Sequence, residues 1–317
     1  MLKYLIVILD DTSVSFCHYE NNRSENNLIS LEELKNGLLW AMKENLMVQL
    51  VYPSYDLPKE YEEVIEMVDH IDITPSTFKG DVVIFNGSGS IPKIAHTTSD
   101  NIVLRLNRKD LFKCVDHLVE LIKNGISFRI IINDIADFNK IDLDTYKSVL
   151  NKLSQAIENT AIYGTETQIN LITDRMLLTD MNNCNAGVES ITLAPDGKFY
   201  ICPAFYHDGL DDVGNPNDGL SIPNQQLFKL EFAPLCRKCD AYHCKRCVWL
   251  NQKMTLEVNT PSHEQCVVSH LERNESMHLL NTLKRRGKIR TNISIPEIDY
   301  LDPFDKIVNN VSSMKIK

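Results

Sequence analysis

The chain has 317 residues, of which 43% are apolar and 24% are charged, with a formal net charge of −10. This composition predicts a globular protein with one large and one smaller domain, and the acidic charge argues against a nucleic-acid partner, which needs a basic surface. No apolar run reaches the roughly 20 residues of a membrane span, and Asp10 and Asp11 stand where a signal peptide needs small residues, so we expect a cytoplasmic protein with no membrane partner.

The first half of the chain alternates short apolar runs with amphipathic segments. The apolar runs predict strands at 4–9, 46–52, 81–85, 101–106, 127–133 and 168–173. The amphipathic segments predict helices at 30–45, 59–69, 108–124 and 142–158. Ser30, followed three residues later by Glu33, has the capping-box pattern that starts a helix. This alternation is typical of a parallel sheet that is covered by helices.

The number of predicted strands limits the architecture. Six strands before residue 180 fit an open sheet or an incomplete barrel, because a closed eight-stranded barrel needs about 250 residues. The alternation stops near residues 178–181, where we place a domain boundary. We therefore expect an α/β fold with a partial (β/α)6 barrel in residues 1–180.

The second half is rich in cysteine. Seven of the nine cysteines fall within residues 184–266: Cys184, Cys202, Cys236, Cys239, Cys244, Cys247 and Cys266. Four of them, the quartet, lie in the stretch CRKCDAYHCKRC and include two CxxC pairs, whose thiolates can bind one centre from a tight turn. In a reducing compartment this density predicts metal or cluster binding rather than disulfides or packing.

The spacing leaves the identity of the metal open. Zinc would accept the same thiolates, but seven cysteines do not complete two tetrahedral zinc sites. Iron–sulfur clusters also bind four thiolates and tolerate another ligand or an open position where a cysteine is absent. The basic side chains beside the quartet are expected to offset the charge of thiolate-bound metal. They are Arg237, Lys238, Lys245 and Arg246.

The order of the seven cysteines resembles the SPASM domain of radical SAM peptide maturases. Gly197, in DGKFYIC, stands between the first two cysteines as it does in that pattern, whereas two gaps of the quartet are one residue shorter. The resemblance implies two auxiliary [4Fe–4S] clusters. One would be bound by Cys236, Cys239, Cys244 and Cys266, and the other by Cys184, Cys202 and Cys247. His207 and Asp208 are candidates for the open fourth position of the second set, with a plain loop role as the alternative.

The N-terminal half resembles the partial barrel of radical SAM enzymes, whose first loop holds a cluster with three cysteines. In the corresponding stretch SVSFCHYE, the three positions are occupied by Ser13, Cys17 and Glu20. Hydroxyl and carboxylate oxygens replace thiolates on iron poorly. We interpret this as a cofactor-binding loop that has lost its cluster, and we do not expect the chain to use S-adenosylmethionine. The alternative is that Cys17 is a plain thiol in a turn.

Most of the chain resembles the CXXX repeat peptide maturase family, in stretches such as AMKENLMVQLVYP and CNAGVESITLAPDGKFYICPAFYH. The resemblance implies that the partner is a small cysteine-repeat precursor peptide. It does not identify the reaction or the catalytic residues. Two hypotheses follow: a peptide-modifying enzyme that does not cleave S-adenosylmethionine, or a non-catalytic protein that binds the peptide for a second maturation protein, a true radical SAM enzyme. A structural zinc protein is a further alternative.

The same resemblances suggest how the chain is divided. We expect a radical-SAM-like partial barrel in residues 1–180, a SPASM-like iron–sulfur domain in residues 181–275, and a C-terminal helix and tail in residues 276–317.

Overall fold

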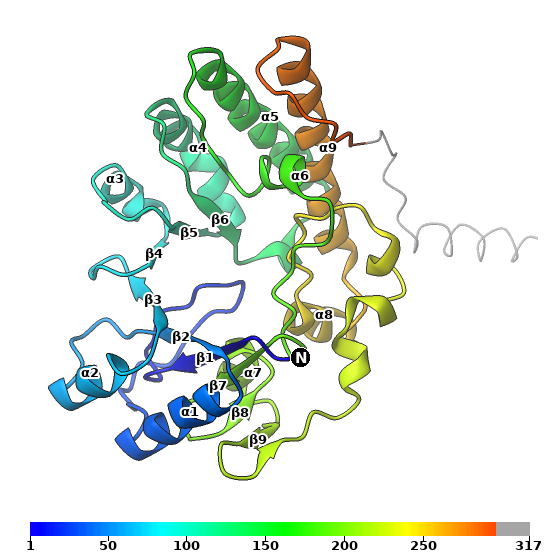
Figure 1. Cartoon of the computed structure of the whole chain (residues 1–317). Helices are drawn as coiled ribbons and strands as arrows, with labels where there is room; N and C mark the ends of the chain where they lie inside the picture. Colours follow the sequence, from blue (N-terminus) through cyan, green and yellow to red (C-terminus); the bar gives the residue numbers. More distant parts are fainter. Residues whose placement is uncertain (296–317) are drawn as a thin grey trace, which may run out of the picture.

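The computed structural model describes residues 1–295, and the end of the predicted tail, residues 296–317, lies outside the described residues. An eight-stranded sheet forms the centre of the molecule, in the order β6-β5-β4-β3-β2-β1-β7-β8 (Figure 1). Its strands are β1 (Tyr4–Ile8), β2 (Met47–Val51), β3 (His70–Pro75), β4 (Val82–Asn86), β5 (Ile102–Leu106), β6 (Arg129–Ile132), β7 (Ser190–Leu193) and β8 (Phe199–Tyr200). Neighbouring strands from β6 to β7 pair in parallel, and β8 pairs antiparallel to β7.

Helices connect and cover these strands. Figure 1 shows α1 to α5 on the outer side of the curved sheet, with α9 beside α5. The helices are α1 (Leu31–Lys43), α2 (Lys59–Ile65), α3 (Ile91–Ile94), α4 (Arg108–Lys123), α5 (Lys140–Ile162), α6 (Asp174–Leu177), α7 (Pro203–His207), α8 (Val248–Thr255) and α9 (His263–Arg285). A small hairpin, β9 (Gly214–Asn215) and β10 (Gly219–Leu220), and 3₁₀ turns such as η5 (Cys236–Lys238) complete the described part. None of the helices within residues 1–295 is both long and apolar enough to cross a bilayer.

Both faces of the sheet are buried, which explains the continuous apolar runs in the sequence. Leu5 and Val7 of β1 belong to the large core between the sheet and the helices. Ile6 of β1, Val51 and Val103 form a second, smaller core on the inner face. Parallel strands that are buried on both faces need apolar side chains at consecutive positions. The predicted α/β fold class with an incomplete parallel barrel is confirmed.

Within residues 1–180 one strand was missed and one was predicted wrongly, and the strands β7 to β10 beyond that range were not predicted. The strand β3 departs from the apolar pattern because His70 and Asp72 lie within it, with His70 Nε2 at 3.5 Å from Asp72 Oδ1. Residues 168–173 were expected to form a strand, but they make turns apart from one isolated bridge between Phe128 and Ile169. The Thr173 hydroxyl donates to the Ile169 carbonyl at 2.9 Å, so a side chain takes the place of a sheet partner.

The cysteine-rich half shares the sheet with the first half. The strand β7 pairs with β1 in the register Tyr4↔Ser190, so residues 190–193 directly extend the barrel sheet. The helix α9 runs without a break through residues 275 and 276, where the sequence suggested a boundary. The division of the chain at residues 180 and 275 stays a prediction.

Candidate functional site

The loop after β1 is closed by hydrogen bonds at the two positions that lack cysteine. Ser13 is 1% exposed, and its hydroxyl donates to the Val51 carbonyl at 2.8 Å and accepts from the Asp10 N–H at 3.0 Å. The Glu20 carboxylate accepts from Arg105 Nη2 at 3.0 Å and from the Asn133 side chain. These oxygens therefore hold the loop in place within the protein.

Arg105, which the sequence analysis did not single out, fastens this loop to the sheet. It lies on β5, is 4% exposed, and donates from Nε to the Cys17 carbonyl at 2.9 Å and from Nη2 to the Tyr19 carbonyl at 2.5 Å. A third bond runs from Nη1 to Asn86 Oδ1 at 2.9 Å. A buried guanidinium with this many hydrogen bonds fixes the backbone of the loop at Cys17 and at Tyr19. The signal in the sequence was a lone charge in the apolar strand IVLRL.

We predict that Arg105→Gln will loosen the loop and destabilise the protein. The shorter neutral side chain leaves loop carbonyls without donors, so we expect the free energy of unfolding to fall by about 2–4 kcal/mol. Urea unfolding measures this change. Lys109→Gln, at an exposed position three residues beyond β5, is the control and should stay within about 0.5 kcal/mol of the parent. Equal stability of the two variants would contradict the role assigned to Arg105.

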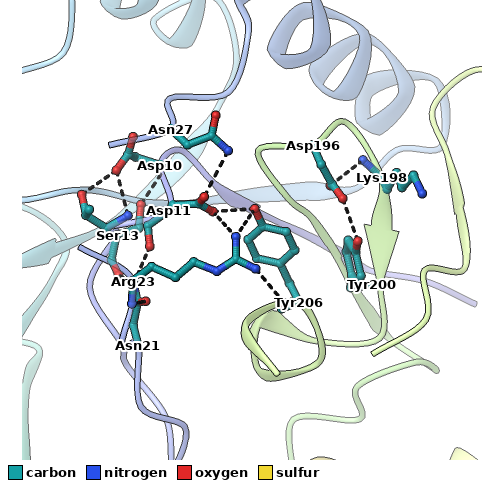
Figure 2. A network of polar contacts seen from close by, with 11 residues as sticks. Asp10, Asp11, Ser13, Asn21, Arg23, Asn27, Asp196, Lys198, Tyr200 and Tyr206 are labelled. Carbon is teal, nitrogen blue, oxygen red and sulfur yellow. Dashed lines mark hydrogen bonds and ion pairs between the residues drawn. The ribbon is translucent and has the colours of Figure 1, made fainter. Parts of the chain in front are cut away.

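A polar network joins the same loop to α7. Figure 2 shows Arg23 and Tyr206 converging on Asp11: Arg23 Nη1 donates to Asp11 Oδ1 at 2.7 Å and to the Tyr206 hydroxyl at 2.8 Å. The Tyr206 hydroxyl also donates to Asp11, and the Arg23 guanidinium lies 4.2 Å above the Tyr206 ring. The loop after β1 is thereby bound to the helix that follows Cys202.

Two further contacts join the first loop to α7 and α7 to α8. The Tyr19 ring stacks on His207 of α7, with centroids 5.3 Å apart and planes 14° apart. Burial lowers the pKa of His207 to about 4, so its ring is neutral near pH 7. Trp249 of α8 donates from Nε1 to Asp208 at 2.6 Å. The segments that carry Cys17, Cys202 and Cys247 therefore meet.

Four cysteines form what we call the first thiol group: Cys17, Cys184, Cys202 and Cys247. Burial raises the pKa of Cys17, and the thiols of Cys184 and Cys247 raise it further. Burial likewise raises the pKa of Cys202, followed by the effects of Cys247 and Cys184. The Cys247 sulfur accepts the Leu250 N–H at 3.5 Å, as cluster-bound sulfurs accept backbone donors. Cys17 therefore lies in the same part of the molecule as three of the predicted metal ligands.

We call four further cysteines the second thiol group: Cys236, Cys239, Cys244 and Cys266. Cys114 belongs to neither group. Burial raises the pKa of Cys244 to about 12, and the thiols of Cys236 and Cys239 add to this effect. The Cys239 sulfur lies 3.5 Å from His270 Nε2. His270 follows Cys266 on α9 by four residues, so the two side chains share one helix face. Cys236, Cys239 and Cys244 thus lie near one another, and the predicted four-cysteine ligand set with Cys266 stays a prediction.

Arg246 is buried between the two groups. It is 1% exposed; Nη1 donates to the Phe228 carbonyl at 2.9 Å, whereas Nε and Nη2 make no hydrogen bond of ordinary geometry within residues 1–295. Burial lowers the pKa of Arg246, while Cys236, Cys184 and Cys244 raise it, so thiols of both groups face the guanidinium.

A buried guanidinium among neutral thiols has no counter-charge. Four thiolates around Zn²⁺ or around a [4Fe–4S]²⁺ cluster carry a net charge of about −2 and would supply one. The donor set therefore fits thiolate-bound metal.

Among the basic residues expected to offset such charge, Arg246 is buried, Lys245 is half-buried, and Arg237 and Lys238 are exposed. In the described part of the chain, no three Cys, His, Asp or Glu side chains stand in metal-binding geometry.

An ionic cluster anchors the second thiol group. Asp240, next to Cys239, accepts two hydrogen bonds from Arg273 of α9, from Nε at 2.6 Å and from Nη2 at 2.5 Å. Arg175 donates to the Asp240 carbonyl at 2.6 Å. Burial alone would raise the pKa of Asp240, but the two guanidinium groups bring it below its ordinary value. Arg273 is fully buried, so this carboxylate is its counter-charge.

A polar pocket of about 310 Å³ adjoins the first loop. Its lining comes from the carboxyl ends of the parallel strands, which is where ligands bind in open α/β sheets. Ser13, Ser15, Ser54, Asn86, Arg105 and Asn133 line it. Arg105 and Glu20 meet on the side of the loop that lines this pocket.

The fold of this chain is similar to that of a solved protein. No family model matches the chain, and no curated protein matches it in sequence. The solved structure of polyhistidine-tagged anSMEcpe with bound AdoMet matches with a TM-score of 0.63 and 12% identity, covering 90% of this chain and 100% of that one. This likeness confirms the expected radical-SAM-like fold.

Weaker matches come from Streptococcus suis. SuiB bound to the precursor peptide SuiA matches with a TM-score of 0.40 and 14% identity, covering 84% of this chain and 76% of that one. SuiB bound to S-adenosylmethionine matches with a TM-score of 0.41 and 13% identity, covering 84% of this chain and 75% of that one.

Proposed function

We propose that this chain is an iron–sulfur protein that takes part in maturing a small cysteine-repeat peptide and does not cleave S-adenosylmethionine. The observation that carries the proposal is the buried Arg246, which faces thiols of two separate groups and forms no ion pair within residues 1–295. One [4Fe–4S] cluster is assigned to Cys236, Cys239, Cys244 and Cys266, and a second to Cys184, Cys202 and Cys247. Bound clusters would supply electron transfer or a binding site for a substrate thiolate.

The first loop supports the absence of S-adenosylmethionine cleavage. Ser13 and Glu20 make hydrogen bonds to Val51, Arg105 and Asn133, and oxygen ligands suit iron–sulfur clusters poorly. Cys17 would be the only thiolate of a cluster in this loop. A single thiolate does not hold a cluster that needs several.

The peptide partner is proposed from the sequence and from the position of the polar pocket. The sequence resembles CXXX repeat peptide maturases, and the pocket opens at the strand ends beside the first loop. Hydroxyl and amide groups in its lining can bind a peptide backbone, which has both donors and acceptors.

A second candidate function is non-catalytic. The hydrogen-bonded first loop equally favours a protein that binds the precursor peptide and presents it to a separate radical SAM enzyme. In that case the thiol groups would hold structural metal, either iron–sulfur clusters or zinc.

The metal content of anaerobically purified protein tests the proposal. We expect about eight iron atoms and as much sulfide per chain, with broad absorption near about 400 nm, because each cluster contains four iron atoms. We also expect no 5′-deoxyadenosine after incubation with S-adenosylmethionine and a reductant. Cys114→Ala is the matched control: Cys114 belongs to neither thiol group, is buried in α4, and should leave the iron content unchanged. Zinc alone would contradict the iron assignment, and 5′-deoxyadenosine would contradict the interpretation of the first loop.

A further inference from the structure

A cavity of about 530 Å³ lies between α5, α6, α9 and the segment that follows α9. Figure 1 shows these helices together at one end of the molecule, where α9 packs against both α5 and α6. The apolar part of the lining consists of Ile157, Ala161, Met176, Leu177, Leu280 and Leu283. The cavity shares no lining residue with the polar pocket beside the first loop. Its volume is in the range that holds the side chains of a short peptide.

Two large apolar side chains at this cavity are exposed. Leu177 of α6 lines the cavity and is 61% exposed, although the neighbouring Met176 is buried. Tyr163, which precedes the lining residue Gly164, is 88% exposed. Covering apolar surface of this kind is favourable by about 25 cal/mol per Å². We therefore expect an occupant that brings apolar side chains of its own.

Basic residues border the same cavity. Residues 284–290 contain five of them among seven positions: Lys284, Arg285, Arg286, Lys288 and Arg290. Lys288 and Arg290 belong to the lining, whose one acidic member is Glu166. Within residues 1–295, Arg286 is the one member of this run that forms an ion pair, with Glu158 at 2.5 Å. On a chain with a net charge of −10, this local excess of positive charge suits an acidic occupant.

The charge of Lys288 meets only a neutral acceptor. Its Nζ donates to the carbonyl of Ile162, the last residue of α5, at 2.7 Å. Lys288 and Arg290 are both exposed. Carboxylates at the mouth of the cavity would therefore find two cations that no acidic side chain of residues 1–295 neutralises.

The chain continues beyond this cavity with a segment that is both acidic and apolar. Residues 297–305 read EIDYLDPFD and lie outside the described residues. The acidic positions are Glu297, Asp299, Asp302 and Asp305, and the large apolar ones between them are Ile298, Tyr300, Leu301 and Phe304. The segment begins six residues after Thr291, which lines the cavity, and an extended chain covers about 3.3 Å per residue. It therefore has the charge, the side chains and the reach that the cavity requires.

We propose that residues 297–305 bind in this cavity, with their apolar side chains against Leu177 and their carboxylates beside Lys288 and Arg290. A tethered segment has an effective concentration in about the millimolar range. A separate acidic peptide of equal affinity must exceed that concentration to take its place, which favours the chain's own segment as the occupant. The cavity contains no cysteine, so the proposal does not depend on bound metal.

Photo-cross-linking in the full-length protein tests the proposal. Tyr300 is replaced with p-benzoylphenylalanine, an aromatic residue that couples to neighbouring C–H groups under ultraviolet light. We expect cross-links within one chain to residues 157–177 or 280–291, located by mass spectrometry. Cross-links scattered over the surface would overturn the proposal, and so would cross-links between chains that disappear on dilution.

Charge variants give a second measurement. Lys288→Glu combined with Arg290→Glu should lower the yield of the cross-link about fivefold or more, and salt at about 0.5 M should lower it as well. The matched control is Lys109→Glu combined with Lys113→Glu, which changes the net charge equally at exposed positions of α4 and should leave the yield within about twofold. Equal yields from the two variants would contradict the role of the basic residues.

A variant of the segment itself guards against misfolding. Asp299→Asn combined with Asp302→Asn leaves residues 1–295 unchanged and should lower the yield as the cavity variant does. The parent and this variant decide the outcome even where the cavity variant does not fold. The same measurements apply to metal-free protein, so a failure of the iron–sulfur assignment and a failure of this proposal are told apart.

Discussion

Replacing Arg246 with methionine is expected to change stability in opposite directions in the metal-loaded and the metal-free protein. If metal is bound as proposed, Arg246 would compensate two anionic centres, and its loss should lower the free energy of unfolding by about 3–5 kcal/mol and release metal. Without metal, the same guanidinium is buried and poorly paired among neutral thiols. Its replacement by an apolar side chain of similar length should then leave stability equal or raise it.

Urea unfolding under anaerobic conditions, with and without prior removal of metal by a chelator, measures both effects. Arg237→Met is the matched control, because Arg237 is exposed beside the same quartet and should change stability by less than about 0.5 kcal/mol in either state. A destabilisation of equal size in both states would show that Arg246 acts through packing, and the charge argument would fail.

Asp240→Asn is expected to destabilise the protein whether or not metal is present. The amide keeps the shape of the carboxylate but removes its charge, which breaks the buried ion pair with Arg273 and weakens the contact with Arg175. Breaking a buried ion pair on one side costs about 3–5 kcal/mol. Because Asp240 joins Cys239 to α9, we also expect weaker metal binding by the second thiol group.

The lowered pKa of Asp240 also predicts how the contribution of this residue to stability changes with pH. The folded-state pKa of Asp240 is lowered, so its contribution is fully present above the unfolded value of about 3.9 and is lost as pH falls through the folded value. The stability difference between parent and variant, measured in metal-free protein, should therefore shrink in acid. Asp211→Asn, at an exposed position, serves as the control. A difference that stays constant down to about pH 2 would contradict the ionic account.

The sequence predicts most of the sheet because its strands are buried on both faces. Runs such as YLIVI and IVLRL match β1 and β5 closely. The pattern fails at β3, where His70 and Asp72 hide the strand, and at 168–173, where an apolar run folds into turns. It also could not reveal that β7 pairs with β1, because no local signal specifies a partner so distant in the chain.

The spacing of the cysteines predicted the cysteine-rich site. It did not predict which residues surround that site. The CxxC pairs identify the quartet from the sequence alone, but the packing of the Cys17 loop against the helix after Cys202 depends on contacts such as Arg23 with Tyr206. From the sequence, Arg246 was expected to offset charge in the same way as Arg237, Lys238 and Lys245. Only its burial in the structure distinguishes Arg246 from these three residues. Spacing describes what lies near in the chain, whereas burial and long-range contacts are set by the whole fold.

The pairing of β7 with β1 has a consequence for biosynthesis. The first strand leaves the ribosome early, yet its second neighbour, residues 190–193, and the partners of the first loop on α7 are translated much later. Long-range pairing of this kind is slow and leaves edges exposed meanwhile. One edge of β1 therefore stays unpaired until residues 190–193 have been translated. We expect a nascent chain that stalls before residue 190 to bind chaperones.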